Sequence, residues 1–175
     1  VMLPISDDTP DFSKQLGPNG FSIVIPCYNR SSKLRRGLLS IFKQKYAGPP
    51  VEIIIVNDGS TDGFYEKTSS VFHKKPSWLE RVVIVDRLGA DDWTSPADSY
   101  NDGFRVVSKN YVIHFGADMA FTDEKSLTSI YKHCDIDRYL VFPQTRVSEE
   151  LQESIRDETL FEDIIKFGVD NPHSV

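Results

Sequence analysis

The sequence predicts an α/β protein, a three-layer α/β/α sandwich with a mostly parallel central sheet. Short apolar runs rich in β-branched residues alternate along the chain with segments whose apolar residues recur at helical spacing. The short runs are apolar throughout, as expected for strands whose two faces are both covered. Strands and helices that alternate in this way form layered folds around parallel sheets.

Composition fits one domain of ordinary size. The chain has 175 residues, of which 39% are hydrophobic and 26% are charged. Its net charge of −6 argues against a general nucleic-acid-binding surface. Cys27 and Cys134 are too few for a disulfide framework, so we expect a reducing compartment, the cytoplasm. No apolar run reaches the roughly 18 residues of a membrane span, and we expect none.

The predicted strands are short apolar runs that end in polar or turn-forming residues. Residues 1–20, rich in Pro, Asp, Ser and Gly, precede them and are expected to form an N-terminal arm to a single domain of residues 21–175. The first strand, FSIVIP, is expected to stop at Pro26, and the second, VEIIIV, precedes the polar turn NDGSTD. In chain order the predicted strands comprise residues 21–26, 51–56, 81–89, 110–118 and 138–147.

The segments between the strands have helical spacing. In SSKLRRGLLSIFKQK, residues 31–45, leucines and Phe42 recur at helical intervals with Lys and Arg between them, and Ser31 or Ser32 is the expected cap. The other helices are expected at residues 62–73 with Ser60 or Thr61 as the cap, at 96–109 with an interruption at Gly103, at 122–134, and at the acidic segment 149–168.

Polar residues directly follow four of the predicted strands. Parallel strands joined by right-handed crossovers bring their carboxyl ends to one edge, where open α/β sheets bind ligands. The residues expected at this edge are Tyr28 and Asn29, Asn57 and Asp58, Asp86 and Arg87, and Asp118. Because each of these strands delivers polar groups to the same edge, the sequence predicts a binding site there.

Two motifs carry a resemblance to a known family. The segments VIPCYNR and IIIVNDGSTD resemble the opening of the family 2 glycosyltransferases, nucleotide-sugar enzymes with the Rossmann-like GT-A fold. In that family a strand ending in Pro-x-Tyr-Asn is followed, one helix later, by a strand ending in Asp-Gly-Ser-x-Asp. The matching residues are Pro26, Tyr28, Asn29, Asp58, Gly59, Ser60 and Asp62.

The resemblance continues further along the chain. SPADSYNDGF looks like the family's small-x-x-Asn-x-Gly helix, with Asn101 and Gly103 in those positions, and YVIHFGAD is similar to its strand and Asp-x-Asp turn. The four motifs occur in order and cover about residues 21–130. A single motif of this kind is a weak indication, whereas four in order are difficult to obtain by chance.

The resemblance implies which residues bind the nucleotide: Pro26, Tyr28, Asn29, Asp58, Arg87 and Asn101. Asp58 can accept a hydrogen bond from an N–H group of a uracil or guanine edge, and Tyr28 can cover the ring or the ribose. The turn that starts at Pro26 offers backbone groups. Asp58 has a second interpretation as part of a common turn that caps a helix. Arg87 is otherwise a surface arginine paired with Asp86.

Asp118 is the candidate metal ligand. The resemblance places it at the second carboxylate of the Asp-x-Asp turn, with Gly116 in place of the first, and implies a bound Mn²⁺ or Mg²⁺. Mg²⁺ needs only one or two carboxylates when phosphate oxygens and water complete its shell, so one aspartate can suffice. The other interpretation is that Asp118 caps the helix predicted at 122–134.

The implied function is transfer of a sugar from a nucleotide-diphosphate sugar to a saccharide or other hydroxyl acceptor, with metal assistance and inversion. UDP is the expected nucleotide from the resemblance. The alternative is a non-catalytic nucleotide-sugar or carbohydrate-binding module of the same fold. A nucleotidyltransferase or a dinucleotide dehydrogenase is disfavoured because no glycine-rich phosphate loop follows the first strand.

The sequence does not identify a catalytic base. The family's later motifs, which build the acceptor half, have no clear match after Asp118. Glu149 and Glu150 follow the fifth predicted strand, where we expect them to begin a helix. Three explanations remain open: further domains of a longer chain, an abbreviated acceptor site, or lost catalysis.

Overall fold

The structure is a computed structural model that describes residues 20–87, 95–134, 140 and 160. Its strands are β1 (Phe21–Cys27), β2 (Val51–Asn57), β3 (Leu79–Asp86) and β4 (Tyr111–His114). Its helices are α1 (Ser31–Phe42), α2 (Phe64–Phe72), α3 (Pro96–Phe104) and α4 (Ser126–His133). Strands and helices alternate along the described chain, as the sequence predicts.

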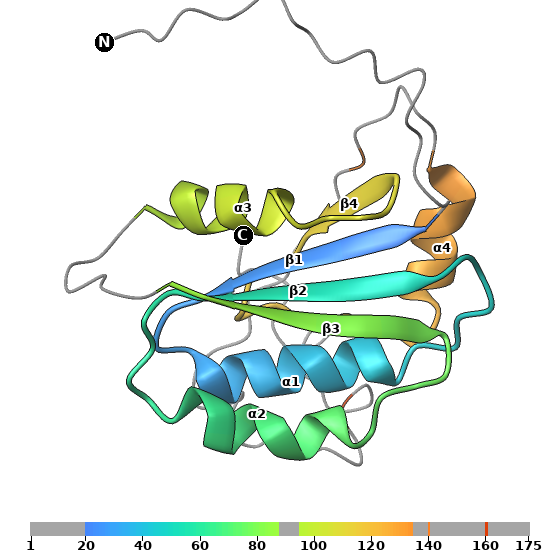
Figure 1. The fold of residues 1–175 in the computed structure, drawn as a ribbon. Helices are drawn as coiled ribbons and strands as arrows, with labels where there is room; N and C mark the ends of the chain where they lie inside the picture. The colour runs from blue at the N-terminus through green and yellow to red at the C-terminus, as the bar shows by residue number, and fades with distance from the viewer. Residues whose placement is uncertain (1–19, 88–94, 135–139, 141–159, 161–175) are drawn as a thin grey trace, which may run out of the picture.

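The four strands form one parallel sheet in the order β3-β2-β1-β4. The register places Phe21 of β1 between Val51 of β2 and Tyr111 of β4. Because all pairings are parallel, the carboxyl ends of the strands lie at one edge, on the left of Figure 1. The predicted parallel sheet is confirmed.

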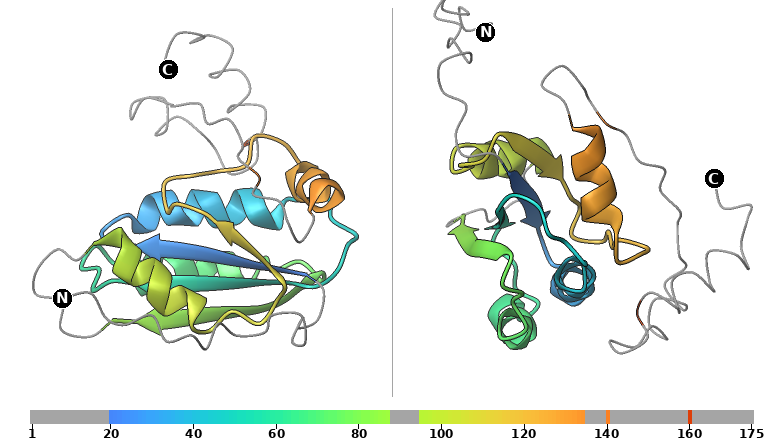
Figure 2. Two further views of the ribbon diagram at one scale, coloured as in Figure 1. Left: turned by 90° about the horizontal axis from the view of Figure 1, so that it is seen from above. Right: turned by 90° about the vertical axis from the view of Figure 1, so that its right-hand side faces the viewer.

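Helices cover both faces of the sheet. α1 and α2 pack on one face and α3 on the other (Figures 1 and 2). A larger core on the α1 face includes Ile23 and Ile53, and a smaller core on the α3 face is built around Val24 and Ile54. Successive residues of each strand therefore enter opposite cores, which explains why the strands are apolar throughout and confirms the three-layer sandwich.

α3 approaches the sheet closely at Gly103. A Cβ atom at this position would lie 2.4 Å from Val24 Cγ1 and 3.2 Å from Val56 Cγ2. The prediction that Gly103 interrupts its helix is wrong, because α3 runs through it to Phe104. The missing side chain instead lets the helix backbone rest on the valines of β1 and β2.

Pro26 lies inside β1 and does not end it. The Val24 carbonyl accepts a hydrogen bond from Phe115 N–H at 3.0 Å, so Val24 and, two residues later, Pro26 direct their backbone groups toward the β4 side. The registered pairing with β4 ends at Val24 and His114. Proline is tolerated here because its missing N–H falls beyond the end of the neighbouring strand.

The helix caps differ from the predicted ones. α1 begins at Ser31, and the residue in its cap position is Arg30 and not one of the two predicted serines. α2 begins after Gly63, whose φ of 82° lies in the left-handed region that favours glycine. Neither Ser60 nor Thr61 is therefore the cap of α2.

Several predicted segments lie outside the described residues: the arm of residues 1–19, residues 88 and 89 of the strand at 81–89, nearly all of the strand at 138–147, and nearly all of the helix at 149–168. Of the strand predicted at 110–118, β4 covers only Tyr111–His114. Within the described ranges, no helix combines the length and the apolar character that crossing a bilayer requires.

A buried carboxylate joins the strands at the amino-terminal edge of the sheet. Glu52 of β2 is fully buried, and its Oε1 accepts hydrogen bonds from Ser22 Oγ at 2.5 Å and from Ser108 N–H at 2.6 Å. Its Oε2 accepts from Arg81 Nε at 2.7 Å and from Ser108 Oγ at 2.9 Å. Burial alone would raise the pKa of Glu52, but these hydrogen bonds outweigh it and lower the pKa. The carboxylate thereby connects three strands with the α3–β4 loop.

Candidate functional site

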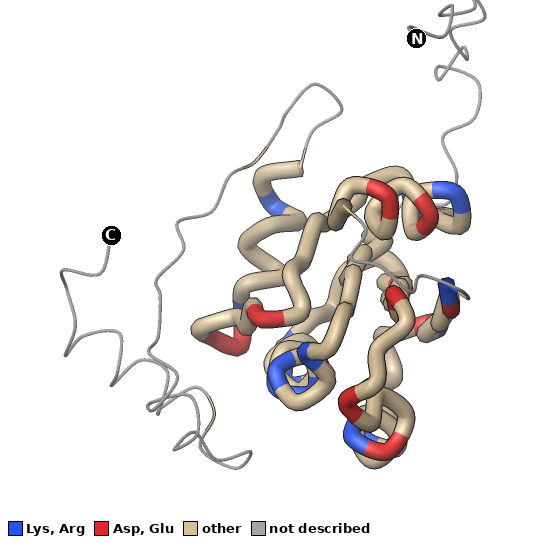
Figure 3. Tube along the Cα trace, turned by 90° about the vertical axis from the view of Figure 1, so that its left-hand side faces the viewer, with Lys and Arg blue, Asp and Glu red and all other residues tan. Residues whose placement is uncertain are grey.

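The carboxyl-terminal edge of the sheet gathers the loops that follow β1, β2, β3 and β4. Seen from the side of this edge, acidic and basic positions are interspersed along the chain (Figure 3). The sequence predicted that four strand ends would meet here, and the parallel order β3-β2-β1-β4 brings them together.

The loops after β1 and β2 are hydrogen-bonded to each other. Asn29 Oδ1 accepts from Thr61 N–H at 2.8 Å, and Asn29 N–H donates to Ser60 Oγ at 3.1 Å. Asn29 has a φ of 50°, a left-handed conformation that asparagine tolerates better than most residues. Asp58 N–H donates to the Cys27 carbonyl at 2.9 Å. The side chain of Asn29 therefore holds the second loop in place, a contact that the sequence did not predict.

Asp62 binds the amino-terminal end of α1 from the neighbouring loop. Its Oδ2 accepts from Ser31 N–H at 2.8 Å, and its Oδ1 accepts from the Ser31 hydroxyl. A carboxylate at this end of a helix satisfies a free N–H group and the helix dipole. Burial alone would raise the pKa of Asp62, but the hydrogen bonds from Ser31 and the charge of Lys67 lower it. Asp62 thus acts as the cap of α1 across 31 residues of sequence.

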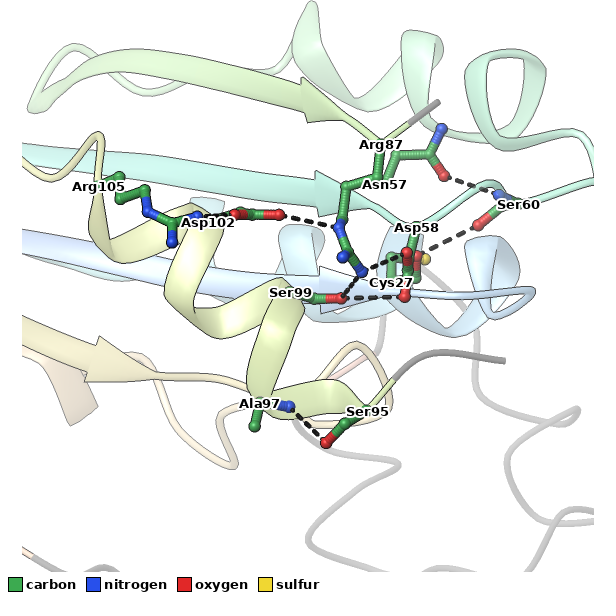
Figure 4. A network of polar contacts seen from close by, with 10 residues as sticks. All are labelled: Cys27, Asn57, Asp58, Ser60, Arg87, Ser95, Ala97, Ser99, Asp102 and Arg105. Carbon is green, nitrogen blue, oxygen red and sulfur yellow. Dashed lines mark hydrogen bonds and ion pairs between the residues drawn. The ribbon is translucent and has the colours of Figure 1, made fainter. Parts of the chain in front are cut away.

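Asp58 is buried and paired with Arg87. Arg87 Nη1 lies 2.7 Å from Asp58 Oδ1, and Ser99 Oγ of α3 donates to Asp58 Oδ2 at 3.0 Å. Arg87 Nε also lies 2.9 Å from Asp102 Oδ2, and Asp102 pairs in turn with Arg105 (Figure 4). Arg87 therefore lies between two carboxylates, neither of which is the expected partner Asp86.

Asp86 has other partners. Asn57 Nδ2 donates to Asp86 Oδ1 at 2.9 Å, and the Tyr65 hydroxyl of α2 donates to Oδ2. The hydrogen bond to the carboxylate raises the pKa of Tyr65. Beside these residues lies a hollow of about 230 Å³, lined by Asn57, Ser60 and Tyr65 among others. The hollow is open to this edge of the sheet.

Asp118 forms an ion pair with Arg30. Asp118 lies in the turn after β4, where Met119 N–H donates to the Gly116 carbonyl at 3.0 Å. This turn rests on α1 at Gly37, where a Cβ atom would lie 2.7 Å from the Met119 carbonyl oxygen. Asp118 is not the cap of the following helix: Lys125 occupies the cap position of α4, and its N–H donates to Asp123 Oδ1 at 2.7 Å.

The turn after β4 offers one carboxylate, that of Asp118, to a divalent cation. Among the described residues, no group of three or more His, Cys, Asp or Glu side chains is arranged to hold a metal ion. Gly116 has no side chain, and a Cβ atom there would lie 2.9 Å from Asp118 Oδ1, so the turn provides a single carboxylate. One half-exposed carboxylate fits Mg²⁺ or Mn²⁺ only when phosphate oxygens supply further ligands.

The other predicted nucleotide-binding residues occupy different environments. Tyr28 is 42% exposed at the edge and can cover a ligand, whereas Pro26 is largely enclosed within β1. Asn101 is exposed on α3. Cys27 is buried, which raises the pKa of its thiol. Its side chain belongs to the larger core on the α1 face.

Sequence reasoning missed several residues of this edge. Arg30 stands directly after the Tyr-Asn pair, inside the VIPCYNR motif, but no role was assigned to it. Ser99 and Asp102 lie three residues apart and contact Arg87 from the same face of α3, a signal that helical spacing could have provided. The role of Asp62 as a cap of α1 depends on tertiary contact and had no local signal.

The family model described as glycosyl transferase family 2 matches residues 22–170. The chain belongs to this family. The match extends from the second residue of β1 to beyond α4 and includes all four motifs. Among curated relatives, a poly-β-1,6-N-acetyl-D-glucosamine synthase of Staphylococcus epidermidis is 31% identical over 105 residues, which are 60% of this chain and 23% of the relative. Glycosyltransferase GlyA of Streptococcus pneumoniae is 30% identical over 112 residues, which are 63% of this chain and 14% of the relative. The chain thus spans less than a quarter of these proteins.

Solved structures confirm the GT-A fold. Staphylococcus aureus TarS in complex with UDP-GlcNAc has a TM-score of 0.53 at 20% identity and covers 65% of this chain and 30% of its own. The mannosyltransferase PcManGT of Pyrobaculum calidifontis, in complex with GDP-Man and Mn²⁺, has a TM-score of 0.54 at 20% identity. The alignment with PcManGT covers 67% of this chain and 34% of the mannosyltransferase.

Proposed function

We propose that this chain is the donor-binding part of a glycosyltransferase that moves a sugar from a nucleotide-diphosphate sugar to a hydroxyl acceptor. The carrying observation is the ion pair between buried Asp58 and partly buried Arg87, at the point where the chain segments after β1, β2 and β3 meet. Family membership and neighbours named as complexes of UDP-GlcNAc and GDP-Man support this donor class.

Asp58 is the proposed partner of the nucleobase. The residue is only 6% exposed and its carboxylate is already oriented by Arg87 and Ser99, so an accepting oxygen is held in place before the base arrives. A directional acceptor of this kind distinguishes bases by their N–H groups. Tyr28 is proposed to cover the ring or ribose, and Pro26, Asn29 and Asn101 to contribute to the same binding surface. Of these, Asn29 acts by holding the loop that carries Asp58.

Asp118 is the proposed ligand of a divalent cation, Mn²⁺ or Mg²⁺. When bound, such a cation stabilises the negative charge that develops on the departing diphosphate. The chain's own part is to hold one carboxylate at the edge, on a turn fixed against α1 at Gly37. Inversion at the sugar carbon follows from the family and is part of the proposal.

A non-catalytic nucleotide-sugar-binding module is the second candidate. Gly116 favours it, because the turn provides one carboxylate, and that carboxylate is paired with Arg30. The two candidates share the donor site and differ in whether the bound donor reacts.

Calorimetric titration with UDP and with GDP, each with and without Mn²⁺, tests both candidates. We expect UDP to bind, with higher affinity in the presence of Mn²⁺, and Asp118→Asn to remove the effect of the metal. Asp123→Asn is the matched control, because Asp123 is an exposed carboxylate only five residues away that binds the start of α4.

Three outcomes decide the matter. If neither nucleotide binds, both candidates are wrong. If the metal effect survives in Asp118→Asn, the ligand assignment is wrong. If UDP-sugar binds and is neither hydrolysed nor transferred, in a preparation that contains the complete protein, the module is the correct description.

A further inference from the structure

We propose that Arg30 is a positioning residue that competes with the divalent cation for Asp118 and gives up this carboxylate when a nucleoside diphosphate binds the guanidinium. The inference rests on the proposed function for its ligand and on the Arg30–Asp118 ion pair for its geometry. It predicts that metal and nucleotide bind cooperatively because they exchange one shared partner.

Both members of the pair are positioned by α1. Arg30 occupies the cap position of α1, and the turn that carries Asp118 packs against Gly37 one to two turns along that helix. A further hydrogen bond of 3.0 Å joins Phe121 N–H to Ser40 Oγ of α1. The proximity of guanidinium and carboxylate is therefore determined by packing, and the pair forms 88 residues apart in sequence without help from its neighbours in the chain.

The pair can also be broken easily. The side chains of Arg30 and Asp118 are 52% and 44% exposed, and ion pairs in water contribute little to stability. A ligand that binds either side chain more tightly can therefore displace the other side chain. This contrasts with Arg87, which is 21% exposed and lies between the carboxylates of Asp58 and Asp102.

The charges at this edge explain what the stronger ligand would be. The chain carries a net charge of −6, so a diphosphate needs a local cation. Of Arg30 and Arg87, which directly follow β1 and β3 at this edge, Arg30 is the more exposed. Arginine can bind phosphate oxygens with two parallel hydrogen bonds, whereas its pair with Asp118 has one contact, through Nη1. A diphosphate also carries more negative charge than one carboxylate, so it is the stronger partner.

Release of Arg30 then completes a metal site. The turn offers one carboxylate because Gly116 leaves no second one, and while Arg30 holds it a cation has little to bind. The diphosphate changes both conditions, since it attracts Arg30 and supplies phosphate oxygens to the cation. Metal binding without nucleotide is therefore expected to be weak, and Arg30 is expected to weaken it further.

The test compares Arg30→Gln with wild type in two separate measurements. In the first, Mn²⁺ is added without nucleotide and the paramagnetic broadening of the amide signals of residues 116–119 is followed by NMR. We expect Arg30→Gln to bind Mn²⁺ about two- to fivefold more tightly, the factor that corresponds to loss of one exposed ion pair. In the second, UDP is titrated with EDTA present, and Arg30→Gln is expected to bind it more weakly by a similar factor.

Lys45→Gln is the matched control. Lys45 forms the same kind of exposed pair, with Glu124 at 2.7 Å and side-chain exposures of 71% and 39%, just beyond the opposite end of α1. Those ends are about 18 Å apart. We expect this substitution to leave both affinities unchanged, so that a general effect of lost charge or loosened helix is separated from the effect at Asp118.

The expected changes in Mn²⁺ affinity and in metal-free UDP affinity have opposite signs, which a merely structural role of Arg30 does not produce. Tighter Mn²⁺ binding together with weaker metal-free UDP binding supports the proposal. Unchanged or weaker Mn²⁺ binding in Arg30→Gln overturns the competition. If wild type binds no nucleotide, the proposed function fails with the diphosphate half of the inference, while the Mn²⁺ titration still decides whether Arg30 and metal compete.

Discussion

Replacing Glu52 with glutamine tests whether the amino-terminal edge of the sheet depends on a buried charge. The carboxylate accepts four hydrogen bonds, two at each oxygen, and the side chain is fully buried. A glutamine amide directs an NH₂ group at one pair of these donors in either orientation. Two charge-assisted hydrogen bonds are lost in consequence, each of which contributes about 1.5–3 kcal/mol.

The expected loss of unfolding free energy is about 3 kcal/mol, the lower end of that sum. Arg81 is 46% exposed, so it can turn into water when its partner is lost, and the Ser108 hydroxyl can rotate to accept from the new amide. Urea denaturation followed by circular dichroism at neutral pH measures the change. Glu124→Gln is the matched control, an exposed pair whose loss is expected to cost under about 1 kcal/mol.

The pH dependence gives the sharper test. The pKa of Glu52 is lowered by folding, so its stabilisation is complete above the unfolded pKa and disappears as the pH falls through the folded pKa. The difference in unfolding free energy between wild type and Glu52→Gln should therefore become smaller once the pH drops below about 4.3, the ordinary pKa of glutamate. If this difference in unfolding free energy does not depend on pH, or is no larger than the difference for Glu124→Gln, the assignment of a stabilising buried carboxylate is refuted.

Three further substitutions are predicted from close contacts. Gly103→Ala should lower the unfolding free energy by about 1–2 kcal/mol in urea titrations, because the new methyl group meets Val24 while helix propensity recovers part of the loss. Gly37→Ala should displace the turn at Met119 and weaken UDP binding in the presence of Mn²⁺ several-fold by calorimetry, with less effect in EDTA. Tyr46→Phe should raise the unfolding free energy by up to about 1 kcal/mol in thermal denaturation, because the buried hydroxyl has no hydrogen-bond partner among the described residues. Burial also raises the pKa of this hydroxyl to about 12, so the group is neutral at the pH of the measurement.

The order of elements was predictable because each apolar run is continuous and each helical segment has regular spacing. Burial on both faces of β1 and β2 produces runs such as FSIVIP and VEIIIV, which can be recognised locally. The helix ends were less predictable. The cap of α1 comes from Asp62 and α3 stops at Phe104, and both depend on contacts between distant segments.

The location of the site followed from parallel topology, whereas its internal pairing did not. Asp58, Arg87 and Asp118 were expected at one edge, and they are there. Their partners could not be foreseen: Arg87 pairs with Asp58 and Asp102, and Asp118 pairs with Arg30. Charge pairing depends on distances of a few ångströms between loops, and spacing along the chain carries no information on this scale. The proposed ligand roles of these residues stay predictions.

The hydrogen bonds between the loops after β1 and β2 have a consequence for any redesign of this protein. Asn29 reaches the backbone of Thr61, while Asp62 reaches back to Ser31, so each loop supplies what the other needs to keep its shape. Transplanting one loop from a relative without the other would leave donors and acceptors unmatched on both sides. The two segments are best treated as one exchangeable part, which evolution and engineers alike have to alter together.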